Sequence, residues 1–360
     1  MSKPAVCKPG RRAAVTIKDV AHHAGVSPMT VSRVVNGSKY VSTAMSEAVR
    51  RAVQELAYSP NLAARNLASE RGERLGVLYG NPSPGYLSEF LVGALKSATR
   101  HGMQLVLQKC DPTPVASRRA VRLLSGSVVG VVLPPPLCES CAVRGELSAA
   151  RLPVVTVASG RPAADTMCVR IDDYTAALEM TRYLISLGHE RLAFIKGHPN
   201  QTVSEERWRG FAAALKEASR ALRGGRPPPR MEQGFFSFRS GLDAARKLLA
   251  ADPAPTAVFA SNDDMAAAVI AEAHRRGLDV PGDLTVVGFD DTLIASTIWP
   301  QLTTIQQPIA RMAAEAIDML VTAVRGSRCR AEGLHRLIPH ALIARASAAA
   351  PRAAASVPRP

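Results

Sequence analysis

Residues 16–36 contain two short helix patterns joined by a glycine, and no other stretch restricts the possible folds of this chain as strongly. Thr16 can cap the first helix, and Asp19 three residues later completes an S/T-x-x-D/E capping box. Gly25 tolerates positive φ and so can end the helix. Between these signals, apolar residues follow helical spacing at Val20, Ala21 and Ala24. We therefore expect a short amphipathic helix between Thr16 and Gly25.

A second short helix is predicted directly after this glycine. Ser27 followed by Pro28 combines an N-cap residue with proline at the first helical position. The predicted buried stripe of this helix is Val31, Val34 and Val35. Its other side presents Met29, Thr30, Ser32, Arg33 and Asn36. Ser, Thr, Arg and Asn hydrogen-bond base edges and phosphates, so the pair of helices is typical of a helix-turn-helix whose second helix enters a DNA major groove. A helical hairpin with a solvated polar face in an unrelated domain is the alternative.

The charge of the chain favours a polyanionic partner. Its 360 residues carry a formal net charge of +15. Residues 1–74 contain 12 Lys or Arg and 5 Asp or Glu, a net charge of +7 on about a fifth of the chain. The charge density is therefore highest around the helix-turn-helix, although the remainder is basic too.

Several classes of protein are disfavoured by what the sequence lacks. No secretory apolar segment and no run of about 18 apolar residues occurs, so we expect a cytoplasmic protein. Six cysteines in 360 residues are not a disulfide framework. Cys138 and Cys141 form a lone C-x-x-C, for which ordinary loop cysteines are favoured over a thiol switch or a metal clip. No G-x-S-x-G, P-loop or G-x-G-x-x-G motif occurs, and His189-Glu190 lacks the second histidine of a zincin, so we expect no enzyme, cofactor or metal.

Two further helices are predicted before residue 72. Ser42 can start a helix over Thr43–Ala57, which would complete a three-helix domain. Ser59 and Pro60 start a segment of eight or nine residues, too short for a stable isolated helix. That segment should become helical only when a partner helix or a nucleic-acid groove packs against it; a structureless linker is the alternative.

From Leu75 onward, predicted strands and helices alternate. The strands are Leu75–Tyr79, Gln104–Gln108, Val128–Leu133, Val154–Val157, Leu192–Lys196, Ala257–Ala260 and Thr285–Phe289. The helices between and after them are Leu87–Arg100, Ala176–Leu187, Glu205–Ala218, Gly241–Ala251, Asp263–Arg276 and Ile309–Val324. Such alternation predicts parallel sheets covered on both faces, and its length predicts two doubly wound lobes with a ligand cleft at the carboxyl ends of the strands. Arg223–Arg230 is expected to be a solvent loop.

These features together resemble the lactose repressor/galactose repressor (LacI/GalR) family of bacterial transcription regulators. The resemblance spans about residues 15–346 and rests on TIKDVAHHAGVSPMTVSRVVNG, YSPNLAARNLA, SLGHERLAFIKG, RWRGF, ASNDDMAAAVI, TVVGFDD, LTTIQQP and LIPHALIARAS. It implies an all-α helix-turn-helix headpiece and an α/β core of two doubly wound parallel-sheet lobes, similar to periplasmic binding proteins.

The resemblance also implies the division of the chain. The expected parts are a disordered basic leader over 1–14, a DNA-binding domain over 15–58, a hinge helix or linker over 59–72, an effector-binding and dimerisation domain over 73–346, and a disordered tail over 347–360. Within the core, the N-lobe is expected to take about 73–172 plus 306–330, and the C-lobe about 173–305 plus 331–346.

By the same resemblance, one set of residues contacts DNA. It comprises Thr16, Ser27, Pro28, Met29, Thr30, Ser32, Arg33, Asn36, Tyr40, Ser42, Asn61, Ala64 and Leu67. Positions 28 and 29 are the family's variable base readers, and the Pro28 side chain has no hydrogen-bonding group. Leu67 matches the leucine that the family wedges into the minor groove.

A second implied set contacts the effector: Tyr86, Arg207, Phe236, Asn262, Asp290 and Gln307. A carboxylate and an amide beside an aromatic wall suit a sugar. A structural ion pair for Arg207, and a capping or solvated pair for Asp290-Asp291, are the alternatives.

The resemblance predicts a homodimeric, sugar-responsive repressor without catalytic activity, released from a palindromic operator by its effector. A corepressor-dependent regulator of the purine type has the same architecture with the opposite response. A sugar-binding protein without a role on DNA is disfavoured by the headpiece.

Overall fold

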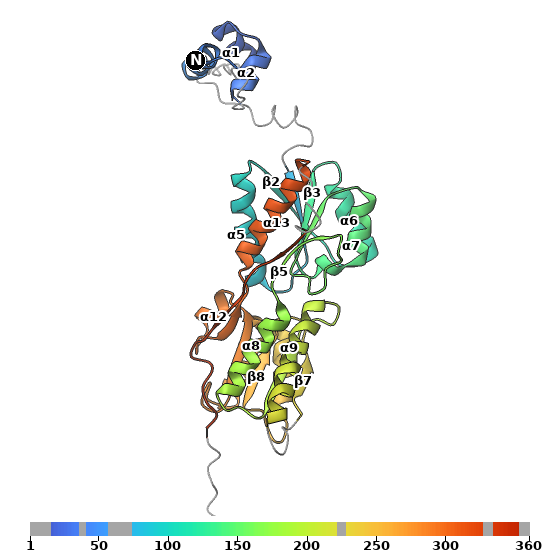
Figure 1. Cartoon of the computed structure of the whole chain (residues 1–360), viewed down its shortest axis with the longest axis vertical. Helices are drawn as coiled ribbons and strands as arrows, with labels where there is room; N and C mark the ends of the chain where they lie inside the picture. The colour runs from blue at the N-terminus through green and yellow to red at the C-terminus, as the bar shows by residue number, and fades with distance from the viewer. Residues whose placement is uncertain (1–15, 36–40, 57–73, 222–227, 327–333, 353–360) are drawn as a thin grey trace, which may run out of the picture. The chain divides into compact units, whose positions relative to one another are not determined.

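The computed structural model describes residues 16–35, 41–56, 74–221, 228–326 and 334–352. The chain divides into two compact units, Met1–Glu70 and Arg71–Pro360, whose elements are labelled in Figure 1.

The N-terminal unit contains α1 (Ile17–Ala24), α2 (Pro28–Val35) and α3 (Thr43–Glu55). Their shared core is Val20, Ala21, Val31, Val49 and Ala52. Because each of these short helices buries only one apolar stripe, the three helices depend on one another for stability. The predicted helix-turn-helix is thereby confirmed.

The turn between α1 and α2 follows from local chemistry. The backbone N–H and the hydroxyl of Thr16 both donate to Oδ2 of Asp19, each at 2.7 Å. Gly25 adopts φ 66°, the left-handed conformation that ends α1. The hydroxyl oxygen of Ser27 then accepts from the Thr30 N–H at 3.1 Å and so starts α2. Val34 is partly buried, and the side chain of Val35 lies outside the described residues.

The first lobe of the core, here called the N-lobe, is a fully parallel six-stranded sheet in the order β11-β5-β4-β3-β1-β2. Its strands are β1 (Arg74–Tyr79), β2 (Gln104–Lys109), β3 (Gly130–Leu133), β4 (Val154–Val157), β5 (Met167–Arg170) and β11 (His335–Leu337). Its helical segments are α5 (Pro84–Arg100), α6 (Pro114–Leu124), the 3₁₀ turn η1 (Leu137–Glu139), α7 (Cys141–Ala149) and α13 (Ile309–Val324). In Figure 1, α5 and α13 lie on one face of this sheet and α6 and α7 on the other.

The second lobe, here called the C-lobe, repeats this plan in the order β12-β10-β9-β8-β6-β7, with only β12 antiparallel to its neighbour. Its strands are β6 (Leu192–Lys196), β7 (Arg230–Gln233), β8 (Ala257–Ala260), β9 (Thr285–Asp290), β10 (Thr303–Gln306) and β12 (Ala341–Ile343). Its helices are α8 (Asp173–Ser186), α9 (Thr202–Ala221), α10 (Phe238–Leu249), α11 (Asp263–Arg275) and α12 (Leu293–Thr297). The predicted fold class, a helical headpiece with two doubly wound lobes, is confirmed.

The chain passes between the lobes three times within the described residues. It crosses after β5, after β10 and after β11. The third crossing corrects the expected lobe boundary. Residues 331–346 were assigned to the C-lobe, but His335–Leu337 pairs in parallel with Cys168–Arg170 of the N-lobe sheet.

Two other expectations need correction. The segment Ser347–Arg352 is not a disordered tail: Ser347 is fully buried and its hydroxyl donates to the Val286 carbonyl at 2.6 Å, and Arg352 pairs with Asp283 at 2.6 Å. Arg230, expected in a solvent loop, instead begins β7 beside Ala193. The leader over 1–14 and residues 353–360 lie outside the described part of the chain. Among the described residues, no helix is long and apolar enough to span a bilayer.

Candidate functional site

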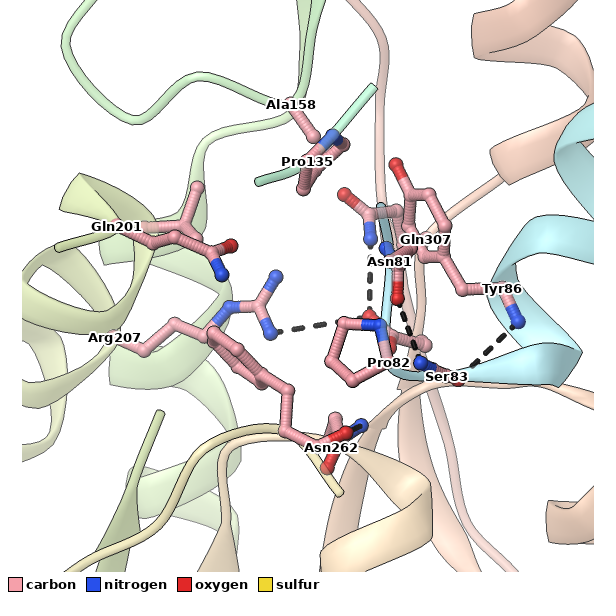
Figure 2. A pocket seen from close by; sticks show the side chains of 13 residues that line it. Asn81, Pro82, Ser83, Tyr86, Pro135, Ala158, Gln201, Arg207, Asn262 and Gln307 are labelled. Atoms are coloured by element: carbon pink, nitrogen blue, oxygen red, sulfur yellow. Dashed lines mark hydrogen bonds and ion pairs between the residues drawn. The ribbon is translucent and has the colours of Figure 1, made fainter. Parts of the chain in front are cut away.

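A pocket lies between the two lobes of the core, where the carboxyl ends of both sheets face each other. The space between its lining residues, including the part open to solvent, is about 380 Å³. It is lined by Asn81, Pro82, Ser83, Tyr86, Pro135, Ala158, Gln201, Val203, Arg207, Phe236, Asn262, Asp290 and Gln307 (Figure 2). All six residues expected to bind an effector are therefore brought together, from segments up to 221 positions apart in the sequence.

Arg207 is the central cation of the pocket wall. It is 3% exposed, and its Nε donates to Oδ1 of Asp173 at 2.8 Å. Nη1 donates to the Ser261 carbonyl at 2.5 Å and lies 3.8 Å from Oδ1 of Asp290. The guanidinium also stacks 3.6 Å from the centre of the Phe289 ring. Arg207 is therefore both a pocket residue and a member of the structural ion pair that was the alternative to ligand contact.

Asp290 supplies a carboxylate in a low-dielectric environment. It is 5% exposed and has φ 112°, an unusual backbone conformation at the last residue of β9. Its Oδ1 accepts from Nε2 of Gln307 at 3.0 Å. Burial raises its pKa well above the usual value, while the Arg207 guanidinium opposes the shift. Asp290 is neither a cap nor solvated, whereas Asp291 pairs with Arg345 at 2.6 Å.

Two polar atoms that belong to pocket-lining side chains have no hydrogen-bond partner in the structure. They are the hydroxyl of Tyr86 and Oε1 of Gln307, on side chains that are 4% and 2% exposed. The Tyr86 hydroxyl is a donor at neutral pH, as in any tyrosine, and burial raises its pKa further above the usual value. Because buried polar groups are normally satisfied, these two atoms indicate where a ligand hydroxyl or carbonyl would bind.

Phe236 forms an aromatic wall of the pocket. It has φ 58°, and its ring lies so close to Gly197 that a Cβ there would be 2.0 Å from the ring. Gly197 at the end of β6 is therefore required for the position of the ring. The side chain is 8% exposed, with Arg207 5.8 Å from the ring centre.

Asn262 lines the pocket, but its amide is largely used by the fold. Its oxygen accepts from the Met265 N–H at 3.1 Å and so caps α11, and its nitrogen donates to the Phe236 carbonyl at 3.1 Å. The next residue, Asp263, is 1% exposed and accepts from the Thr304 hydroxyl at 2.6 Å and from the Thr292 N–H at 2.8 Å. Burial raises the pKa of Asp263 to about 7.

The sequence did not single out several pocket residues. Asn81-Pro82-Ser83 follows β1 after Gly80, and Asn81 accepts from the Ser83 N–H at 2.8 Å. Gln201 directly precedes α9, and Val203 is the second residue of that helix. Their position after predicted strands was the available signal, since ligands of doubly wound sheets bind at strand carboxyl ends. Asp173 gave no comparable signal, because its contact with Arg207 spans 34 residues.

The predicted DNA-contacting residues with described side chains lie on the N-terminal unit. Met29 is 65% exposed and Pro28 and Arg33 are exposed, whereas Thr30 and Ser32 are half-buried. The Thr30 hydroxyl lies 2.9 Å from that of Ser27, and Thr16 and Ser42 precede their helices. The other predicted residues, Asn36, Tyr40, Asn61, Ala64 and Leu67, are outside the described residues.

The cysteines of the C-x-x-C motif are separated by their surroundings. Cys138 is 2% exposed, and burial raises its pKa well above the usual value, while Cys141 is exposed at the start of α7. Both are free. The described part of the chain contains no group of three or more His, Cys, Asp or Glu arranged to hold a metal.

A helix-turn-helix joined in one chain to a two-lobed core with an interlobe pocket defines a class, the ligand-responsive DNA-binding regulators. Comparisons with known proteins agree. The family model described as bacterial regulatory proteins, lacI family, matches residues 16–61, and the model of the periplasmic binding protein-like domain matches 181–348.

Individual relatives cover almost all of the chain. The ribose operon repressor of Escherichia coli (strain K12) is 34% identical over 310 residues, which are 85% of this chain and 92% of that repressor. The structure of the transcriptional regulator CelR–cellobiose complex matches with TM-score 0.70 and 30% identity, covering 93% of this chain and 100% of that one. The Lac repressor dimer bound to operator and the anti-inducer ONPF matches with TM-score 0.76 and 27% identity, covering 94% and 100%.

The chain belongs to the LacI family of bacterial transcription regulators. The predicted resemblance is thereby confirmed. These relatives are named as regulators of transcription, which also confirms the prediction of a regulator rather than an enzyme.

Proposed function

We propose that this regulator is a homodimeric repressor of carbohydrate-utilisation genes, released from a palindromic operator by an uncharged, hydroxyl-rich effector in the interlobe pocket. The convergence of Tyr86, Arg207, Asp290 and Gln307 on one cavity is the observation that carries the proposal. A ribose operon repressor and a cellobiose complex among the relatives support the carbohydrate class.

The charge balance of the pocket favours a neutral effector. The Arg207 guanidinium already faces two buried carboxylates, those of Asp173 and Asp290. A phosphate or carboxylate on the ligand would meet those carboxylates without an uncommitted cation among the residues that line the pocket. A sugar hydroxyl can instead donate to Asp290 or Gln307 and accept from Tyr86, while its C–H face packs on Phe236.

On DNA, α2 is proposed to enter the major groove, with Met29, Arg33 and Asn36 as the readers. Met29 and Arg33 are exposed, and Pro28 beside them has no hydrogen-bonding group. Thr16, Ser27, Thr30, Ser32 and Ser42 are proposed to contact the backbone or bases, and Asn36, Tyr40, Asn61, Ala64 and Leu67 remain predictions. Since its target is genomic DNA, the protein is proposed to act in the cytoplasm.

Dimerisation is supported by exposed apolar side chains on the core. Val92 and Leu95 of α5 and Leu107 of the edge strand β2 are 62%, 50% and 45% exposed. Trp299, just after α12, is 80% exposed. Contiguous exposed apolar patches on a folded protein mark interfaces, α5 and β2 pack against each other, and a relative was solved as a dimer on its operator.

Two steps test the proposal. Operator fragments are selected from genomic DNA with the full chain, and a panel of sugars with their phosphorylated counterparts is screened by thermal shift. The compound that raises the melting temperature is then titrated into the protein–operator complex and followed by fluorescence anisotropy.

Release of the operator by an unphosphorylated sugar is the expected outcome. Tighter operator binding would instead identify a corepressor-dependent regulator. A melting temperature raised by the sugar phosphates alone would refute the proposed neutral effector.

A further inference from the structure

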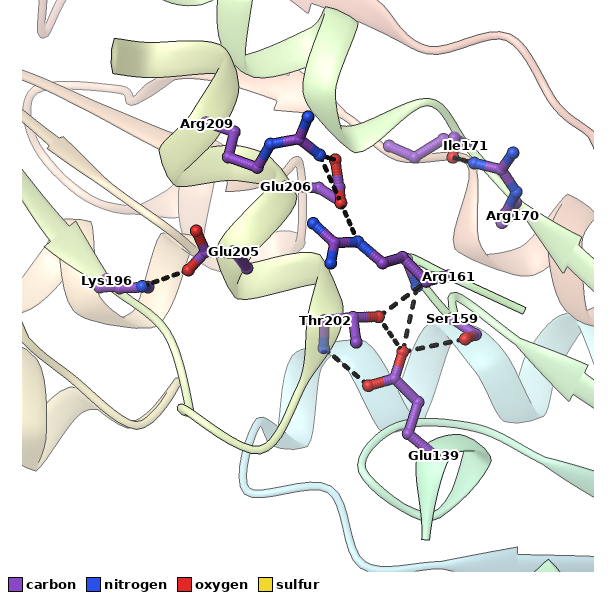
Figure 3. A network of polar contacts seen from close by, with 11 residues as sticks. Glu139, Ser159, Arg161, Arg170, Ile171, Lys196, Thr202, Glu205, Glu206 and Arg209 are labelled. Carbon is purple, nitrogen blue, oxygen red and sulfur yellow. Dashed lines mark hydrogen bonds and ion pairs between the residues drawn. The ribbon is translucent and has the colours of Figure 1, made fainter. Parts of the chain in front are cut away.

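A carboxylate of the N-lobe accepts hydrogen bonds from the first residue of a helix in the C-lobe. Glu139, in η1, accepts hydrogen bonds from its own lobe through the Ser159 hydroxyl at 2.9 Å and the Gly160 N–H at 3.1 Å. From the other lobe, the Thr202 N–H donates to it at 2.6 Å, and the Thr202 hydroxyl also donates to it. Figure 3 shows the dashed lines from Thr202 and Ser159 converging on this carboxylate.

Thr202 is the first residue of α9, so its N–H belongs to the end of the helix that has no acceptor within the helix. An anionic acceptor there is favoured by both the hydrogen bond and the helix dipole. Glu139 therefore stabilises the first turn of α9 from the opposite lobe.

A second contact reinforces the first. The Arg161 side chain, in the loop between β4 and β5, pairs with Glu206 of α9 at 2.5 Å, and the Arg161 N–H donates to the Thr202 hydroxyl at 3.1 Å. Glu206 is 9% exposed and is also held by Arg209 at 2.8 Å. The N-lobe thus contacts the first two turns of α9 at two residues, Thr202 and Glu206.

The backbones of the two lobes also approach closely here. A Cβ on Gly160 would lie 2.7 Å from the Val203 nitrogen and 2.8 Å from the Thr202 carbonyl carbon. Gly160 therefore permits the approach that brings Glu139 and Thr202 together.

Along α9, the residues that contact the N-lobe alternate with residues that line the pocket. On α9 and the residue before it, Gln201, Val203 and Arg207 line the pocket, whereas Thr202 and Glu206 contact the N-lobe. In the N-lobe loop, Ala158 lines the pocket and the next three residues join the network. Any shift of this network therefore moves two walls of the pocket.

We propose that Glu139 and Arg161 are positioning residues, which fix the α9 wall of the pocket and hold the two lobes together along this edge. Neither side chain lines the pocket. The consequence for ligand affinity rests on the effector site proposed above, while the consequence for α9 does not.

Hydrogen–deuterium exchange of the full chain, without added ligand, tests the positioning role directly. The variants are Glu139→Ala, Glu139→Gln and Arg161→Ala. Glu205→Gln is the matched control, because Glu205 is on the same turn of α9 but pairs with Lys196 of its own lobe at 2.5 Å.

We expect exchange in the segment 198–206 to be at least about tenfold faster in Glu139→Ala, with a smaller increase in Glu139→Gln, which keeps one acceptor oxygen. Exchange in α11 and in the Glu205→Gln control should match the wild type. An increase of less than about twofold in both Glu139 variants, or a uniform increase through the core, would overturn the positioning role. If Glu139→Ala does not fold, Glu139→Gln and Arg161→Ala give the same decision.

Calorimetry with the sugar that gives the largest thermal shift provides the second measurement. We expect Glu139→Ala to bind it at least about tenfold more weakly, and Glu205→Gln to bind it as the wild type does. Wild-type affinity in Glu139→Ala would overturn the link to the pocket. If no sugar shifts the wild-type melting temperature, the proposed effector class fails, while the exchange result still decides the role of Glu139.

Discussion

Replacing Arg207 with methionine should destabilise the core strongly, because it removes the cation from a buried cluster of charges. Methionine keeps much of the length and apolar stem of arginine, so the change leaves little cavity. Asp173, which is 2% exposed, loses the hydrogen bond to Oδ1, and its Oδ2 already has no partner. Asp290 keeps only the amide of Gln307 among the contacts described above.

Breaking one partner of a buried ion pair typically costs about 3–5 kcal/mol, because the remaining charge stays buried without compensation. We expect a loss of this size in the free energy of unfolding of Arg207→Met at pH 8. An exposed ion pair such as Arg182–Glu217, at 55% and 49% exposure, should contribute less than about 1 kcal/mol and serves as the control.

The loss should also depend on pH in a defined direction. Burial already raises the pKa of Asp173 and Asp290 in the folded protein, and Arg207 opposes that rise. Without Arg207 both pKa values rise further, so the folded variant binds protons more tightly than its unfolded chain. Its stability must then fall as the pH rises above the unfolded pKa of about 4, and the loss relative to wild type is smaller at pH 5 than at pH 8.

Urea denaturation followed by tryptophan fluorescence measures this loss, because both tryptophans, Trp208 and Trp299, are in the core unit. The double variant Arg207→Met/Asp173→Asn should recover part of the lost free energy of unfolding, since it removes a buried carboxylate that has lost its cationic partner. A loss below about 1 kcal/mol at pH 8, an equal loss at pH 5, or no recovery in the double variant would refute the reasoning.

Three further predictions concern separate parts of the molecule. Asp263 has a pKa of about 7 in the folded protein, so its contribution to stability falls as the pH rises from about 4 to about 7. The Tm of Asp263→Asn should therefore decrease less between pH 5 and pH 8 than the Tm of the wild type. An equal decrease in the two proteins would contradict this. Gly197→Ala should displace the Phe236 ring and weaken sugar binding at least about tenfold by calorimetry without unfolding the core; wild-type affinity would show that the ring is not a wall of the site. Arg33→Ala should weaken operator binding by about 1–3 kcal/mol and relax the preference at the base pair that Arg33 reads, and an unchanged preference in anisotropy titrations with operator variants would contradict that role.

The strands at the centres of the two sheets were predictable because they are buried on both faces. Val154–Val157, Leu192–Lys196 and Ala257–Ala260 have the predicted bounds, and each reads as a short apolar run. Such runs are typical of parallel strands covered by helices. Ile309–Val324 was likewise predicted at its observed bounds, from a helical apolar period.

Among the described residues, the edge strand β2 was predicted, whereas the edge strands β7, β11 and β12 escaped prediction because they bury too little to show an apolar pattern. Arg230–Gln233 and His335–Leu337 are mostly exposed, and each has a single partner strand. Arg230–Gln233 follows a proline run that indicates a loop. In these segments backbone pairing with an inner strand decides the structure, and side-chain patterning contributes little.

The pocket was predictable only where its residues follow strands or match a family motif. Arg207, Asp290 and Asn262 met these conditions. Asp173 and Glu139, which support the pocket without lining it, did not, because their partners Arg207 and Thr202 are 34 and 63 residues away. The chain passes three times between the two lobes, so residues that meet in the structure are far apart in the sequence. No local sequence pattern encodes such a contact.

The interlobe contacts explain why a small ligand could control this molecule. Glu139 and Arg161 bind α9 on one side of the pocket. On another side, Gly85 of the N-lobe lies close to Thr292 of the C-lobe, since a Cβ on Gly85 would be 3.2 Å from the Thr292 side chain. Between these contacts, Tyr86 of the N-lobe and Arg207 of the C-lobe face the same cavity. A ligand that hydrogen-bonds both side chains gains its full binding energy only when the lobes are in this arrangement. Its differential affinity for that arrangement, rather than its total affinity, is therefore the quantity available to change DNA binding.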